Sequence, residues 1–299
     1  MQRQHSSRFR IAIGEFPFRR TLAMLIAAGL AVSSRAEGVL DPHGPIAAAD
    51  REILLNSTTI MLVVVVPVIV LILAFAWWYR ASNARASYQP TWVNSGRIEF
   101  VVWSIPAMVV LLLAGVAWIG SHDLDPARKL PSDLKPVRIE VVALDWKWLF
   151  IYPDLQVATL NQITVPTGVP IEFVLTSSNV MNAFWVPQLG SQIATMPGMT
   201  TRLNLLAEHT GDYPGLSSNF SGDGFSDMRF VVHAVPAAAF SSWLAVTQSQ
   251  GERLDAGAYA QLALSGSDVS IRDYGSVESG LFERIERETS GAPADRMEK

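Results

Sequence analysis

A stretch in the last third of the chain, Tyr213 to Met228, has the spacing of a ligand-binding loop. It reads YPGLSSNFSGDGFSDM, with glycines at 215, 222 and 224 and small polar residues at 217, 219 and 221. The stretch contains neither cysteine nor histidine, and its one soft donor is the thioether of Met228. The loop therefore has the spacing of a metal site and lacks the side chains that would bind a transition metal.

The composition indicates a protein that lies partly in a membrane. Hydrophobic residues make up 49% of the 299 residues and charged residues 17%, against roughly 25% charged in ordinary soluble domains. The formal net charge of −4 gives no reason to expect a nucleic-acid partner. Because the sequence contains no cysteine, disulfides, thiolate metal sites and lipid-anchored cysteines are excluded.

The first apolar segment is typical of a secretory signal peptide. Two arginines at 19 and 20 precede a short apolar run over 21–32, and small residues follow at 34 and 36. We expect residues 1–36 to be removed by cleavage between Ala36 and Glu37. The alternative is a short anchor helix, but the run is too short to cross ~30 Å of hydrocarbon.

Two further apolar segments predict membrane-spanning helices. Ile60 to Tyr79 and Phe100 to Gly120 each run without a charge for about the ~20 residues that a span needs. The alternative for either segment is a buried core helix. The loop over 80–97 carries three arginines and no acidic residue, whereas residues 37–56 carry one arginine and four acidic residues. The positive-inside rule therefore places the loop in the cytoplasm and the rest of the mature chain outside.

The remainder of the chain predicts an exported β domain followed by helices. From about residue 135, short β-rich runs alternate with proline and glycine turns, which is typical of a β-sandwich or barrel. After Pro236 the composition favours short helices, and the last ten residues favour disorder. The predicted segments are a signal peptide (1–36), a short periplasmic segment (37–56), two transmembrane helices (57–79 and 99–120) joined by a cytoplasmic loop (80–98), a linker (121–134), the β domain (135–236) and a C-terminal helical arm with a disordered tail (237–299).

This order of segments resembles subunit II of the haem–copper respiratory oxidases, in which the exported domain is a cupredoxin. The cytochrome c oxidase members hold two copper ions with a histidine in H-S-F-W and with the cluster C-x-E-x-C-G-x-x-H-x-x-M. Here NAFWVPQLG (182–190) and the opening loop keep both frames. The corresponding positions hold Asn182 and Phe225 for the two histidines, Ser217 and Ser221 for the cysteines, Asn219 for the glutamate, and the surviving Met228.

These replacements predict a cupredoxin-like domain that binds no copper. Serine hydroxyls are hard, neutral oxygens, and one thioether cannot replace two bridging thiolates and two imidazoles. The pattern resembles subunit II of the cytochrome bo-type ubiquinol oxidases. Several further segments carry this resemblance: LDPHGPIA (40–47), AWWYRASN (76–83), VVALDWKWLFIYP (141–153), VMNAFWVPQLGSQIATMPGMTTRL (180–203) and GFSDMRF (224–230).

The resemblance implies a non-catalytic subunit of a proton-pumping ubiquinol oxidase in the bacterial inner membrane. It implies that haems, copper and quinol are bound by a partner, subunit I, and that subunits III and IV complete the complex. Cytochrome c would not be a partner. Two alternatives stay open: a cytochrome c oxidase subunit II with atypical copper, and a membrane-tethered cupredoxin-like binding or assembly protein that acts alone.

A few residues outside the loop suggest separate roles. The resemblance implies that Glu99, at the cytoplasmic start of the second span, lies at the mouth of a proton path into subunit I; the alternative is an interfacial carboxylate paired with Arg97. Trp146 and Trp148 are expected to be packing residues in the absence of copper. The histidines at 43, 122, 209 and 233 show no metal-ligand spacing, and we expect none of them to bind a metal.

Overall fold

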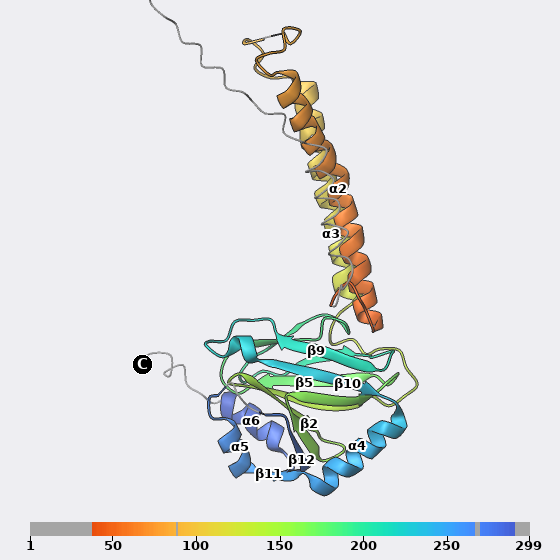
Figure 1. Cartoon of the computed structure of the whole chain (residues 1–299), viewed down its shortest axis with the longest axis vertical. Helices are drawn as coiled ribbons and strands as arrows, with labels where there is room; N and C mark the ends of the chain where they lie inside the picture. The colour runs from red at the N-terminus through yellow and green to blue at the C-terminus, as the bar shows by residue number, and fades with distance from the viewer. Residues whose placement is uncertain (1–37, 88, 267–269, 291–299) are drawn as a thin grey trace, which may run out of the picture. The chain divides into compact units, whose positions relative to one another are not determined.

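The computed structural model describes residues 38–87, 89–266 and 270–290. The predicted signal peptide, its cleavage point between Ala36 and Glu37, and the tail at 291–299 lie outside the described residues. The described chain contains two long helices, a β-sandwich and a C-terminal arm of helices and short strands (Figure 1). This is the architecture that the sequence predicts, a two-helix hairpin followed by an all-β domain and a helical arm.

The two long helices are α2 (Pro45–Trp78) and α3 (Gly96–Asp123), and both are long and apolar enough to cross a membrane. Their large apolar side chains are exposed along most of their length within this chain, as expected of surfaces that face lipid or another membrane protein. Both helices extend beyond the predicted spans. Helix α2 begins at Pro45, a residue suited to the first helical turn. Hydropathy alone places the start of the helix later in the chain, after the charged residues at 50–52.

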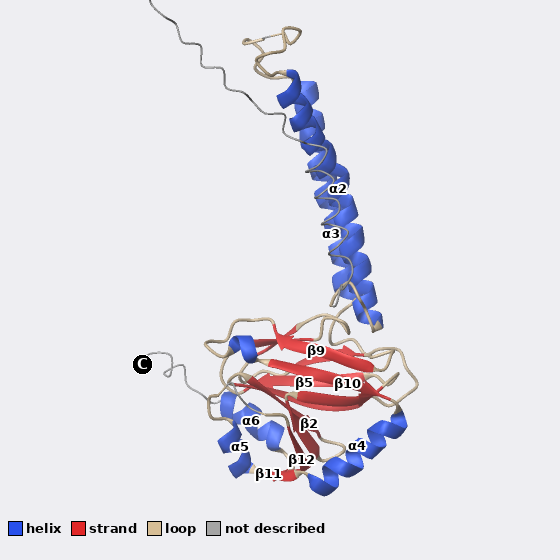
Figure 2. Ribbon diagram, in the orientation of Figure 1, coloured by secondary structure: helices blue, strands red, loops and turns tan. Residues whose placement is uncertain are grey.

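The sandwich consists of two sheets, shown as arrows in Figure 2. One sheet has the strand order β11-β12-β3-β2-β1-β5-β8, and the other has the order β4-β10-β9-β6-β7. The strands of the first sheet are β1 (Val137–Leu144), β2 (Lys147–Tyr152), β3 (Val157–Leu160), β5 (Ile171–Ser177), β8 (Thr201–Leu205), β11 (Glu252–Leu254) and β12 (Arg272–Val277). The strands of the second sheet are β4 (Gln162–Pro166), β6 (Asn182–Trp185), β7 (Ile193–Thr195), β9 (Gly211–Ser217) and β10 (Arg229–Val235).

A continuous apolar core lies between the two sheets. It is rich in aromatic side chains, which meet in edge-to-face and stacked pairs; the rings of Phe184 and Phe230 are stacked with centroids 4.9 Å apart. Trp148 and Phe150 on β2 contact the same pair of rings. Burial of these apolar side chains between the sheets gives the sandwich an apolar basis for its stability.

A second core lies on the other face of the first sheet, under the C-terminal arm. The arm contains α4 (Ala237–Gln250), α5 (Ala256–Leu262) and α6 (Leu281–Ser290), and the apolar face of α6 packs with Leu149 and Ile151 of β2. Strand β2 is therefore buried on both faces, which explains the apolar run WLFIY that follows Lys147. The sequence predicted helices here but not β11 and β12, which extend the first sheet through pairing of β12 with β3.

Candidate functional site

The candidate site is formed where two neighbouring strands of the second sheet meet. Strand β6 begins at Asn182 and strand β9 ends at Ser217, and the two strands pair antiparallel with Phe184 opposite Ser217. A loop follows β9 and leads into a short 3-10 turn, η2 (Phe225–Asp227). The fold thus brings together residues 35 positions apart, as the two sequence frames predict.

A buried hydrogen bond joins the two strands at this point. The hydroxyl of Ser217 lies 3.2 Å from the side-chain oxygen of Asn182 and 3.3 Å from the carbonyl oxygen of Asn219. The side-chain amide of Asn182 donates to the carbonyl oxygen of Val180 at 3.2 Å. Asn182 and Ser217 are 1% and 2% exposed. Because buried polar groups are costly without partners, this network is what allows both side chains to stay buried.

The other predicted positions surround this network without converging on a common point. The Asn219 side chain donates to the carbonyl oxygen of Met181 at 3.2 Å, which ties the two loops together. The hydroxyl of Ser221 is shielded and has no hydrogen-bond partner in the described part of the chain. The ring of Phe225 lies against the exposed ring of Phe220, and Met228 is part of the main core.

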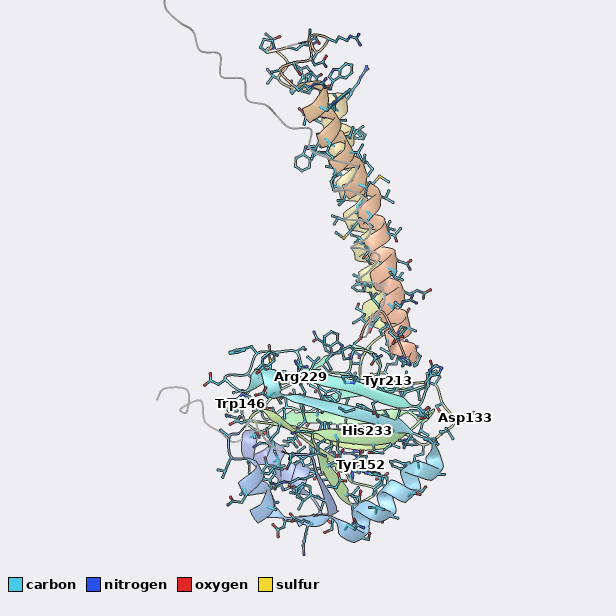
Figure 3. All side chains as sticks on the ribbon, viewed as in Figure 1. Asp133, Trp146, Tyr152, Tyr213, Arg229 and His233 are labelled. Atoms are coloured by element: carbon cyan, nitrogen blue, oxygen red, sulfur yellow. The ribbon has the colours of Figure 1, made fainter. Side chains whose placement is uncertain are left out.

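Trp146 lies directly against the loop. It has a φ of 63°, an uncommon conformation for a bulky residue, and its indole nitrogen donates to the carbonyl oxygen of Ser221 at 3.0 Å. A Cβ at Gly224 would fall 2.4 Å from the indole ring, so only glycine leaves room for this contact. Trp146 directly precedes strand β2, and Tyr152 is the last residue of that strand (Figure 3). Trp146 therefore closes the loop by packing, and Trp148 is fully buried in the core.

Three comparisons relate this site to known proteins. Residues 149–235 match the family described as cytochrome c oxidase subunit II, periplasmic domain. The ubiquinol oxidase subunit 2 of Acetobacter aceti is 44% identical over 249 residues, which cover 83% of this chain and 81% of that protein. The cytochrome bo(3) ubiquinol oxidase subunit 2 of Pseudomonas aeruginosa is 43% identical over 269 residues, which cover 90% of this chain and 81% of that protein.

The chain belongs to the ubiquinol oxidase subunit 2 family. The resemblance drawn from the sequence is confirmed. Among solved structures, the periplasmic domain of subunit II of the cytochrome oxidase of Bradyrhizobium japonicum is 22% identical. The match between the two covers 41% of this chain and 99% of the solved domain, with a TM-score of 0.39.

The ubiquinol oxidase subunit 2 site does not fit the copper that the cytochrome c oxidase frame implies. The side chains at the six positions offer amide and hydroxyl oxygens, one thioether and a phenyl ring, and the two most buried polar ones are already bonded to each other. Copper in such sites prefers thiolate and imidazole donors. Within residues 38–87, 89–266 and 270–290, no group of three or more histidine, cysteine, aspartate or glutamate side chains is placed to hold a metal ion.

A cluster that the sequence analysis missed lies where the chain enters α2. The rings of His43 and His209 have centroids 5.8 Å apart, and the ring of Tyr213 lies 5.2 Å from that of His43. The Nε2 atom of His43 lies 3.2 Å from a carboxylate oxygen of Asp41. Backbone bonds from His43 to Gln188 and from Glu208 to His43 fix the segment on the sandwich. The segment LDPHGPIA (40–47) therefore attaches α2 to the exported domain.

Glu99 lies in the first turn of α3, where its backbone N–H donates to the carbonyl oxygen of Ser95 at 2.9 Å. Its side chain is exposed. Among the described residues, no cationic side chain lies within 4 Å of the Glu99 carboxylate, so the alternative pairing with Arg97 is absent from this structure. A carboxylate at this position is favoured by the positive end of the helix dipole.

Proposed function

We propose that this chain is the redox-inactive subunit of a respiratory ubiquinol oxidase, and that it acts by assembly and support rather than by electron transfer. The buried bond between Ser217 and Asn182 is the observation that carries the proposal. Those two positions would have to supply a thiolate and an imidazole for electrons to enter through copper, and they instead satisfy each other. Haems, copper and the quinol site then belong to the partner, subunit I.

The persistence of the sandwich without a metal has a physical basis in the main core. Side chains from both sheets fill the space between them, and the aromatic rings of Trp148, Phe184 and Phe230 pack against one another there. Loss of metal ligands at the edge of this core removes no packing from it. The domain can therefore keep its fold and its contacts with a partner after it has lost a redox role.

The proposed location is the inner membrane of a bacterium, with two spans and the exported domain in the periplasm. Helices α2 and α3 supply the spans. The arginines Arg80, Arg85 and Arg97 supply the orientation, because basic residues are enriched in cytoplasmic loops. The exposed apolar faces of both helices support packing on subunit I, with subunits III and IV completing the complex.

We also propose that Glu99 takes part in proton uptake from the cytoplasm. Two observations support this role: the carboxylate lies at the predicted cytoplasmic end of α3, and it has no cationic partner within 4 Å in the described chain. Ionisable groups at a membrane edge are costly unless they are solvated or functional. The dipole of α3 offers a purely structural explanation, and the turnover and stability of a Glu99→Gln variant separate the two.

One experiment tests the redox-inactive role. The complex is purified through a tag on this chain and assayed with ubiquinol and, separately, with reduced cytochrome c, and its copper content is measured. We expect haem to co-purify, oxygen to be consumed with ubiquinol alone, and the copper content to be unchanged by Ser217→Ala. If Ser217→Ala lowered the copper content, the chain would instead be a copper-binding subunit II of the cytochrome c oxidase class. A chain that purifies without any haem-bearing subunit would identify a binding or assembly protein that acts alone.

A further inference from the structure

A hollow of about 210 Å³ lies between the outer ends of α2 and α3 and the loop that connects β6 to β7. It is separate from the candidate loop described above. Three elements line it: α2 with Asp50 and Ile53, α3 with Val116, Ala117 and Ser121, and the connecting loop with Ser191.

The position of the hollow relative to the membrane follows from the sequence of α3. The uncharged run ends at Gly120, and Ser121 is the first polar residue after it. Across the helix pair, Ile53 packs against Gly120 so closely that a Cβ there would fall 2.7 Å from the Ile53 Cδ1 atom. The hollow therefore lies where the hydrocarbon layer meets the lipid headgroups. Its apolar wall, Val116 and Ala117, lies on the hydrocarbon side of that boundary.

The charge in the hollow is uncompensated. Asp50 is half-buried, and its carboxylate accepts a hydrogen bond of 2.8 Å from the Ser191 hydroxyl. In the described part of the chain, no cationic side chain lies within 4 Å of this carboxylate. Burying a carboxylate without a counter-charge is unfavourable. A cationic ligand would remove that cost.

The hydrogen-bonding groups specify which cation fits. The Ser191 hydroxyl already donates to Asp50, and the Ser121 hydroxyl donates to the carbonyl oxygen of Trp118 at 2.9 Å. A hydroxyl has one proton and two lone pairs, so both oxygens can still accept. The hollow thus presents a carboxylate and two hydroxyl oxygens, all of them acceptors. A primary ammonium, with three N–H donors, matches this set, whereas a quaternary ammonium has no donor and an anion is repelled.

We propose that this hollow binds the primary ammonium headgroup of a membrane phospholipid. Asp50 supplies the counter-charge, Ser121 and Ser191 accept from the remaining N–H groups, and an acyl chain lies along Val116 and Ala117. The membrane is the source because the hollow opens at headgroup depth and has an apolar wall on its hydrocarbon side. The lipid would fill the junction between the membrane helices and the exported domain.

The test measures lipid retention by the full chain within its purified complex. The complex is reconstituted into nanodiscs that contain equal amounts of phosphatidylethanolamine, phosphatidylcholine and phosphatidylglycerol, released, and examined by native mass spectrometry. We expect one phosphatidylethanolamine to be retained on this chain in preference to the other two lipids. Asp50→Asn should lower that retention about tenfold, the effect of roughly 1.4 kcal/mol in binding. Asp133→Asn, which removes an exposed carboxylate in the linker before β1 and away from the hollow, is the matched control and should change nothing.

The remaining outcomes decide against the proposal. Equal retention of phosphatidylcholine, or retention that is unaffected by Asp50→Asn in a complex with normal haem content, would overturn it. Binding of ethanolamine to the lipid-depleted complex, together with no preference for phosphatidylethanolamine in the nanodiscs, would reassign the hollow to a soluble amine. Cross-linking of a photoreactive residue at Ser121 to another subunit, in place of lipid, would show that a protein segment fills the hollow. The lipid-preference arm uses the unaltered protein, so a folding defect in the Asp50 variant leaves the proposal testable.

Discussion

The hydroxyl of Ser217 and the side-chain oxygen of Asn182 lie 3.2 Å apart, and both residues are almost completely buried. In a copper-binding relative these two positions would carry a cysteine and a histidine. Here the same backbone frame holds two polar side chains that satisfy each other and need no ion. The loop has the spacing of a metal site, but its buried residues form a hydrogen bond between strands β6 and β9. We call this bond between Ser217 and Asn182 the joint.

This joint should contribute to stability and not to catalysis. Ser217→Ala removes the donor and leaves the buried Asn182 oxygen without it, so we expect a loss of about 1–3 kcal/mol in the free energy of unfolding. Ubiquinol oxidation per complex should be unchanged. Thermal unfolding of the purified chain and turnover of the assembled complex measure the two effects.

The double variant Asn182→Leu with Ser217→Ala provides the control for this prediction. Replacing both polar partners removes the unsatisfied group, so the double variant should be more stable than the sum of the two single losses predicts. Additive losses would show that the bond between the two side chains contributes nothing of its own.

The contact between Trp146 and Gly224 should be sensitive to a single methyl group. Gly224→Ala places a Cβ 2.4 Å from the indole ring, so the ring must move and its bond to the Ser221 carbonyl oxygen should be lost. We expect a cost of about 1–3 kcal/mol, as for overpacking in general. A shift in tryptophan fluorescence should accompany the change.

Gly257→Ala is the matched control for overpacking. At that position a Cβ would meet its nearest neighbour, an oxygen of Asp255, at 3.4 Å. Gly257 lies inside helix α5, where alanine is the better helix former, so this substitution should be neutral or slightly stabilising. If Gly224→Ala behaves in the same way, the loop is more adaptable than the contact with Trp146 indicates.

The carboxyl group of Glu140 should make the stability of the exported domain depend on pH. Burial raises the pKa of Glu140 above its ordinary value of 4.5, and the ion pair with Arg138 only partly offsets this. The folded state therefore holds the proton more tightly than the unfolded state. The stability that Glu140 contributes is fully present below pH 4.5 and is lost as the pH rises through the folded-state pKa. Glu140→Gln, which cannot ionise, should flatten this dependence and make the protein more stable at pH 7 than the unaltered chain.

Asp154 provides a control whose contribution to stability changes with pH in the opposite direction. The hydrogen bond from Lys135, 2.7 Å long, lowers the pKa of the Asp154 carboxyl, so its contribution is present at neutral pH and is lost as the pH falls. Both side chains are exposed, and surface pairs contribute little, so Asp154→Asn should have a small effect.

A Glu140→Gln variant that is less stable at pH 7 would show that the Arg138 pair outweighs the cost of burial.

The sequence predicts those parts of the fold that depend on local patterns. The hydropathy of residues 60–79 and 100–120 predicts α2 and α3, and the two ligand frames predict that Asn182 and Ser217 lie together. The continuation of α2 back to Pro45 is not predicted, because charged residues at 50–52 end the hydropathy signal while the backbone remains helical. Strand β12 is also missed, since its short polar sequence forms a strand only by pairing with β3.

Contacts between distant segments are the part that the sequence could not predict. His43 and His209 look scattered along the chain, yet backbone bonds on both sides of His43 bring their rings within 5.8 Å of each other. The hydroxyl of Ser191 meets the carboxylate of Asp50 across 141 positions of sequence. Neither pair belongs to a periodic pattern, so each depends on how the sandwich closes against the start of α2.

The proton role of Glu99 is the prediction with the clearest functional outcome. Glu99→Gln keeps the size and the polarity of the side chain and removes only its capacity to carry a proton. If protons enter through this carboxyl, turnover and the initial rate of proton uptake should both fall, on the order of a hundredfold, the lower end of the range for a positioned proton-transfer group. Stopped-flow measurement with a pH dye, on the purified complex in vesicles, follows both. Arg97→Gln alters a charge two residues away on the same helix and should leave them unchanged. Loss of the favourable dipole interaction alone would lower stability by about 0.3–1 kcal/mol without slowing turnover, which identifies Glu99 as a structural helix-terminal residue.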